Sequence, residues 1–106
     1  WIASKFGFYS IVCKDDAQFH VRARLKGDLQ NLLEATGLEE KIHQSDYSDY
    51  KYRLVVGHDA VRKITSTLAE TLDYPNFKNK IAETPSQEPK LHAYHCIWEV
   101  MYSEQV

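Results

Sequence analysis

The chain has 106 residues, of which 43% are hydrophobic and 26% are charged, and its formal net charge is −2. This length suits a single domain, residues 1–106, with a hydrophobic core of its own. The small net charge argues against binding of nucleic acid or anionic membrane through bulk charge, although a local basic patch stays open.

The first segments predict an antiparallel β-hairpin. Residues 6–13, FGFYSIVC, are aromatic and β-branched, which predicts a strand buried on much of both faces. A polar break at residues 14–17 separates it from a second strand, residues 19–25, which alternates in polarity. The apolar face of the second strand carries Phe19, Val21, Ala23 and Leu25. Its polar face carries His20, Arg22, Arg24 and Lys26.

A helix is predicted to follow at Gly27 and Asp28, where the hydrophobic period changes. Asp28 is a good N-cap residue, because its carboxylate accepts hydrogen bonds from the free amides of a first helical turn. Leu29, Leu32 and Leu33 then share one helical face, and Gly37 is a typical helix end.

The second half of the chain repeats this order of elements. Residues 41–44 predict a weak strand, and residues 50–56 predict a strong one with Lys51 and Arg53 on its polar face. Asp59 is the predicted N-cap of a longer helix that ends near Asp73.

Two further helical segments complete the chain. Residues 77–82 predict one or two helical turns, and the stretch TPSQEP at residues 84–89 is too short to separate domains. Residues 90–103 predict a last helix that is apolar over a wide arc, so we expect it to be largely buried.

Two ten-residue stretches resemble each other at an offset of 31 residues. FHVRARLKGD begins at Phe19, and YKYRLVVGHD begins at Tyr50. The similarity reflects either a duplicated β-β-α unit or two separate strand-to-helix corners with the same chemistry. Both interpretations predict an α+β fold of the ferredoxin-like or a related type, with an antiparallel sheet, helices on one face and an extra C-terminal helix.

The polar faces of the two strong strands form the main candidate site. They carry His20, Arg22, Arg24, Lys26, Lys51 and Arg53. If helices cover the other face, these cations share an open surface with Tyr9 and Ile11, which suits phosphates and stacked bases. The alternative is an ordinary solvated face neutralised by acidic partners. The RNP signature of RRM domains is absent.

The last helix supplies weaker candidates. Two histidines of this helix, His92 and His95, could contact one metal ion, with Cys96 or His58 as a further ligand. Two ligands do not make a site and no metal-binding motif accompanies them, so we expect no metal or cofactor. Residues Tyr74, Asn76, His92 and His95 are candidates to line a pocket. We find no nucleophile elbow and no phosphate-binding glycine loop, so an enzyme is the less favoured class and no catalytic residue is assigned.

The compartment is predicted to be the cytoplasm. Cys13 and Cys96 have no CxxC spacing, which favours reduced thiols over a disulfide framework. The sequence contains no run of about 18 apolar residues and no charged-then-apolar leader, so we expect no membrane partner.

Four motifs resemble a group of small bacterial proteins of about a hundred residues with no established activity. The motifs are WIASKFGFYSIV, FHVRAR, DYPNFK and YHCIW. The resemblance spans nearly the whole chain and implies a stand-alone cytoplasmic protein, but it transfers no ligand and no catalytic residue.

Three hypotheses of function follow from these patterns. The first is a non-enzymatic binding or regulatory module that takes nucleic acid or a nucleotide on the basic sheet face. The second is a protein-interaction or homodimerisation module that exposes an apolar patch around Trp98 and Tyr102. The third is a small enzyme with a pocket beside the last helix.

Overall fold

The computed structural model describes residues 1–15 and 17–106, so residue 16 of the predicted polar break lies outside the described part. The chain forms two compact units, Trp1–Leu72 and Asp73–Val106. Among the described residues, none of the helices has the length and apolar character that crossing a membrane requires.

The described residues of the first unit form a five-stranded antiparallel sheet in the order β1-β2-β3-β5-β4. The strands are β1 (Ile2–Ala3), β2 (Phe8–Asp15), β3 (Gln18–Ala23), β4 (His43–Gln44) and β5 (Tyr52–Val56). The predicted hairpin is confirmed as β2 and β3, and the weak strand as β4. Within the strand predicted at residues 6–13, the residues up to Val12 are buried or half-buried, and the expected burial fails only at Cys13, which is exposed at the hairpin end.

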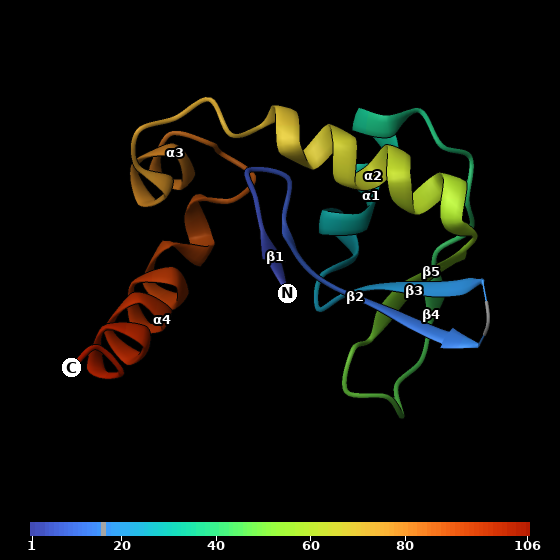
Figure 1. Cartoon of the computed structure of the whole chain (residues 1–106), viewed down its shortest axis with the longest axis horizontal. Coiled ribbons are helices and arrows are strands. Elements are labelled where there is room, and N and C mark those ends of the chain that lie inside the picture. Colours follow the sequence, from blue (N-terminus) through green and yellow to red (C-terminus); the bar gives the residue numbers. More distant parts are fainter. Residues whose placement is uncertain (16) are drawn as a thin grey trace. The chain divides into compact units, whose positions relative to one another are not determined.

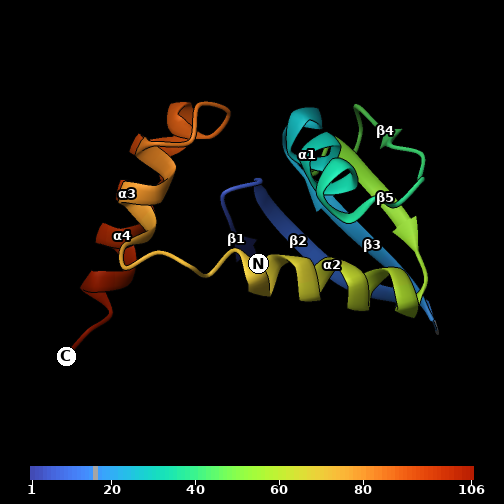
Figure 2. The ribbon, with the colours of Figure 1, turned by 90° about the horizontal axis from the view of Figure 1, so that it is seen from above.

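Helices α1 (Lys26–Thr36) and α2 (His58–Glu70) lie on the same side of this sheet (Figures 1 and 2). Their apolar stripes, including Leu29, Leu32 and Ile64, pack on Val21 and Leu54 to form the core. These five side chains are fully buried, with no exposed surface. The predicted α+β architecture with helices on one face is therefore confirmed, and it is compatible with the ferredoxin-like type.

The β-β-α order occurs twice, as β2-β3-α1 and β4-β5-α2. The second strands of the two copies, β3 and β5, are neighbours at the centre of the sheet. Arg22 and Arg53, which are equivalent at the offset of 31 residues, lie directly opposite each other in this pair. The offset of 31 residues therefore matches the register of β3 and β5 at these two arginines.

Both predicted N-caps were wrong. Helix α1 begins at Lys26 after Leu25, and α2 begins at His58 after Gly57, so Asp28 and Asp59 lie inside the first helical turns. The Asp28 carboxylate is buried, and its Oδ2 accepts a hydrogen bond from the Phe8 amide at 3.1 Å. A tertiary partner therefore uses the side chain that the local pattern assigned to a cap.

The second unit contains α3 (Phe77–Ala82), a short 3₁₀ helix η1 (Glu88–Lys90) and α4 (Leu91–Ser103). Asn76 caps α3, because its side-chain oxygen accepts from the Asn79 amide at 3.0 Å. Phe77 packs edge-on against Tyr94 of α4, with ring centroids 4.9 Å apart. The unit is therefore held together by aromatic packing between its two longer helices.

The expectation that the last helix is largely buried was wrong. Tyr94 is its one buried residue, whereas Trp98 is 51% exposed and Val100 and Met101 are each 63% exposed. The physical reason is size, because two short helical segments cannot cover an apolar arc this wide.

Candidate anion-binding face of the sheet

The register of the strands brings polar side chains together on the side of the sheet opposite α1 and α2. Ser10 of β2 lies opposite Arg22 of β3, Arg22 lies opposite Arg53 of β5, and Arg53 lies opposite His43 of β4. Directly opposed residues share one face of a sheet, so these four side chains form a row across the strands. His20 precedes Arg22 by two residues and projects from the same face. Arg24 lies just beyond the end of β3. We call the surface formed by His20, Arg22, Arg24 and Arg53 the basic face.

The Arg22 guanidinium is held in place by its neighbours. Its Nη2 donates to the Ser10 hydroxyl at 2.6 Å, and its Cζ lies 4.7 Å from the centroid of the Tyr50 ring. Its Nε is buried and makes no hydrogen bond with the described residues. Arg22 is thus preorganised, which reduces the conformational entropy that a ligand contact would cost.

Tyr50 supports Arg24 as well, and its predicted place was wrong. The strand predicted at residues 50–56 included Tyr50, but β5 begins only at Tyr52. Tyr50 instead lies before the strand, 4% exposed, with the Arg24 Cζ 4.1 Å from its ring centroid. Arg24 also donates to the Asp49 carbonyl oxygen. One buried ring therefore aligns two guanidinium groups by cation–π contact.

Arg53 is oriented by a histidine. Its Nη1 lies 3.0 Å from the Nδ1 atom of His20. A guanidinium only donates, so His20 accepts at Nδ1 and carries its proton on Nε2. Burial, and then the positive charges of Arg53, Lys14 and Arg22, lower the pKa of His20 from 6.5, against an opposing effect of Asp15. Neutral His20 therefore adds no charge to the basic face near neutral pH.

We predict that His20 titrates below pH 6.5 in an NMR pH titration of the folded chain. The pKa of His20 is lower in the folded chain, so the unfolded chain binds this proton more tightly. Above pH 6.5 neither state binds it, and His20 does not affect the free energy of unfolding. As the pH falls from 6.5 through the reduced pKa, the unfolded chain is protonated first and the free energy of unfolding decreases. His20→Asn keeps an acceptor for Arg53 but cannot titrate. Urea unfolding at about pH 7.5 and about pH 5.5 should show a smaller loss of stability for this variant than for wild type. An equal loss in both proteins would contradict the prediction.

The arginines of the basic face have no acidic partner in the part of the chain that the structure describes. Among the described residues, Arg22, Arg24 and Arg53 form no ion pair with a carboxylate. Like charges directly opposite each other in a sheet are destabilising, so the Arg22–Arg53 pair carries an electrostatic cost that a bound anion would offset.

The two predicted lysines differ from the arginines. Lys51 pairs with Asp46 at 3.6 Å, and both side chains are at least half exposed. Lys26 is an exposed residue of the first turn of α1 and does not belong to a strand. The solvated ion-pair alternative therefore describes Lys51, but it does not describe the three arginines.

The expectation that Tyr9 and Ile11 lie among the cations was wrong. Ile11 lies opposite Val21 and packs against the core on the helix-covered face. Tyr9 is fully buried in that core, and its hydroxyl donates to the Asp28 carbonyl oxygen at 2.7 Å. On the basic face, β2 contributes Ser10 and Val12 instead. The centre of the face therefore offers the guanidinium donors of Arg22 and Arg53 together with the imidazole rings of His20 and His43, and not the expected Tyr9 ring.

The candidate metal ligands do not form a complete site. His92 Nε2 lies 3.7 Å from Cys96 Sγ, while His95 pairs with Glu99. His58 belongs to the first unit, where its ring packs on Phe19. Within residues 1–15 and 17–106, no group of three or more His, Cys, Asp or Glu side chains is placed to hold a metal ion.

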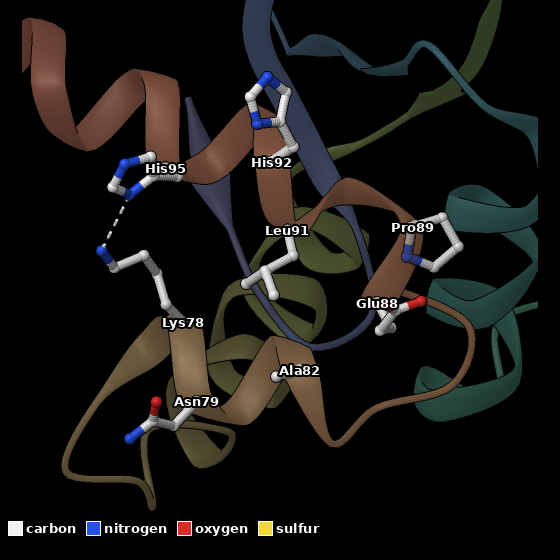
Figure 3. Close-up of a pocket in the computed structure, with 8 residues that line it drawn as sticks. All are labelled: Lys78, Asn79, Ala82, Glu88, Pro89, Leu91, His92 and His95. Atoms are coloured by element: carbon white, nitrogen blue, oxygen red, sulfur yellow. Dashed lines mark hydrogen bonds between the residues drawn. The ribbon is translucent and has the colours of Figure 1, made fainter.

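The second unit contains a cavity of about 590 Å³ between its helical segments (Figure 3). It is lined by Lys78, Asn79, Ala82, Glu88, Pro89, Leu91, His92 and His95. The predicted pocket residues His92 and His95 thus share this cavity. Tyr74 and Asn76 do not line it, because Tyr74 packs on Phe77 and Asn76 caps α3.

The exposed apolar side of α4 is the feature that the interaction hypothesis requires. It carries Ile97, Trp98, Val100, Met101 and Tyr102. Homodimerisation or binding of another protein through this side stays a prediction.

Comparisons with protein-family models, curated proteins and solved structures found no match to this chain. The resemblance to small bacterial proteins stays an expectation from the sequence motifs. We therefore base the proposed function on the geometry of the basic face.

Proposed function

We propose that the protein is a non-enzymatic binding or regulatory module that takes a phosphate-bearing partner, nucleic acid or a nucleotide, on the basic face. One observation carries the proposal: Arg22 and Arg53 lie directly opposite each other on the side of their sheet away from α1 and α2, and neither forms an ion pair with a carboxylate of residues 1–15 or 17–106. An oxyanion between them would replace repulsion by two charge-assisted contacts.

The side chains suit phosphate better than a simple halide or a base. Guanidinium groups bind phosphate oxygens through two parallel hydrogen bonds. The guanidinium groups of Arg22 and Arg24 both lie over the ring of Tyr50, which keeps them close together. Because guanidinium groups form its centre, the face is expected to contact backbone phosphates. Such contacts position a nucleic acid without reading its sequence.

The salt dependence of binding tests this proposal. With about three phosphates contacted, the affinity for a labelled single-stranded oligonucleotide should fall about 20-fold between 50 mM and 200 mM salt. A mononucleotide should show a smaller slope, because it offers fewer phosphates at one site. Fluorescence anisotropy measures both. An affinity that is unchanged by salt, or no binding of either probe at low salt, would exclude the proposal.

A further inference from the structure

The cavity of the second unit has the dimensions of a ligand site. Its volume of about 590 Å³ is that of a small-molecule site, and it is a groove open to solvent, since six of its eight lining residues are exposed. Side chains from three elements line it, namely α3, η1 and α4. Figure 3 shows Lys78 and His95 together at one end, Leu91 and Ala82 between, and Glu88 and Pro89 at the other end.

One end of this cavity is cationic. Lys78 Nζ lies 3.4 Å from His95 Nδ1 and 4.7 Å from the centroid of the Trp98 ring. His95 Nε2 in turn lies 3.2 Å from a Glu99 carboxylate oxygen. Lys78 forms no ion pair among the described residues, so its ammonium keeps donors available for an anionic group.

The rest of the cavity determines which groups a ligand can have beyond its anionic end. Leu91, Ala82 and Pro89 present apolar surface, which favours a hydrocarbon body. Glu88 at the far end has no ion-pair partner among the described residues, so a second negative charge there would be repelled. A ligand with one charged end and one apolar end fits both conditions.

We propose that this cavity binds a small monocarboxylate with an apolar tail, its carboxylate at Lys78 and its tail over Leu91 and Ala82. This site is separate from the basic face in the residues that form it and in its ligand class. Glu88 is the residue that discriminates against dicarboxylates.

Trp98 is a reporter for the site, because the Lys78 ammonium lies over its ring. The chain has two tryptophans, Trp1 and Trp98, so a Trp1→Phe background isolates the signal. Hexanoate, hexanol and adipate serve as matched probes for one, no and two carboxylates. We expect a saturable change of Trp98 fluorescence with hexanoate at about 1 mM, and at least tenfold weaker responses to hexanol and adipate.

Variants separate the contributions of the two ends. Lys78→Met should remove the preference for hexanoate over hexanol, while Lys63→Met on α2 removes the same charge and should change nothing. Because Lys78→Met alters the environment of Trp98, amide chemical shifts of Ala82 and Leu91 give a second measurement. Glu88→Gln leaves Lys78 in place and should bring adipate binding up towards that of hexanoate.

Three results would overturn the inference: no saturable response to hexanoate, equal responses to hexanoate and hexanol, or equal wild-type responses to hexanoate and adipate. Alanine at Arg22 and Arg53 should leave hexanoate binding unchanged. The failure of this inference is therefore distinguishable from failure of the basic-face proposal.

Discussion

Replacing Arg22 and Arg53 together by alanine is expected to abolish oligonucleotide binding, with a loss of at least 100-fold in affinity at low salt. Each guanidinium supplies a charge-assisted contact to phosphate, and such contacts contribute about 1.5–3 kcal/mol each. The two groups are cross-strand partners and act on one anion, so the double variant removes the centre of the face.

The matched control for this variant removes the same charge elsewhere. Arg62 and Lys63 are exposed residues of α2, on the helix-covered side of the sheet, and Arg62 pairs with Asp59 at 3.0 Å. Arg62→Ala with Lys63→Ala should weaken binding by only a few-fold through long-range charge. Equal losses in the two double variants would mean that bulk charge, and not the basic face, holds the anion.

Lysine at both positions separates charge from geometry. Arg22→Lys with Arg53→Lys keeps the net charge but loses the bidentate fork and the planar stacking of Arg22 on Tyr50. We expect affinity between that of wild type and the alanine variant, with a similar salt slope.

Gly7→Ala is expected to lower the free energy of unfolding by about 3 kcal/mol, the largest stability effect that we predict. A Cβ atom at Gly7 would lie 2.4 Å from Asp28 Cγ and 2.8 Å from Asp28 Oδ2. That carboxylate cannot move without cost, because it is buried and accepts the Phe8 amide hydrogen bond. The added methyl group therefore forces apart the start of β2 and the first turn of α1.

Gly27→Ala is the control for this effect. Its Cβ would meet nothing within 4 Å, and the residue lies in the first turn of α1. Alanine there should leave stability unchanged or raise it by up to about 1 kcal/mol through helix propensity. Urea unfolding of both variants measures the difference. A Gly7→Ala protein as stable as the Gly27→Ala protein would show that the Gly7–Asp28 contact is not a close one.

Local pattern determined the elements of this protein and, for the alternating strands β3 and β5, the side of the sheet on which a residue lies. Alternation in residues 19–25 placed Arg22 on a polar face, and the change of period at Gly27 marked the start of α1 to within two residues. Residues 77–82 were predicted as helical with the bounds that α3 has. These features depend on neighbours in the chain, so the sequence contains what is needed to predict them.

The tertiary structure alone decided which of these surfaces meet. Alternation cannot tell that β3 and β5 are neighbours, or that their register sets Arg22 opposite Arg53. The pattern predicted that Asp28 caps a helix, because it cannot reveal a hydrogen bond to the Phe8 amide 20 residues away. It predicted that α4 is buried, because an apolar arc does not show whether another segment covers it. Pairing between distant segments depends on loop geometry and on competition among partners, and neither leaves a periodic signal in the chain.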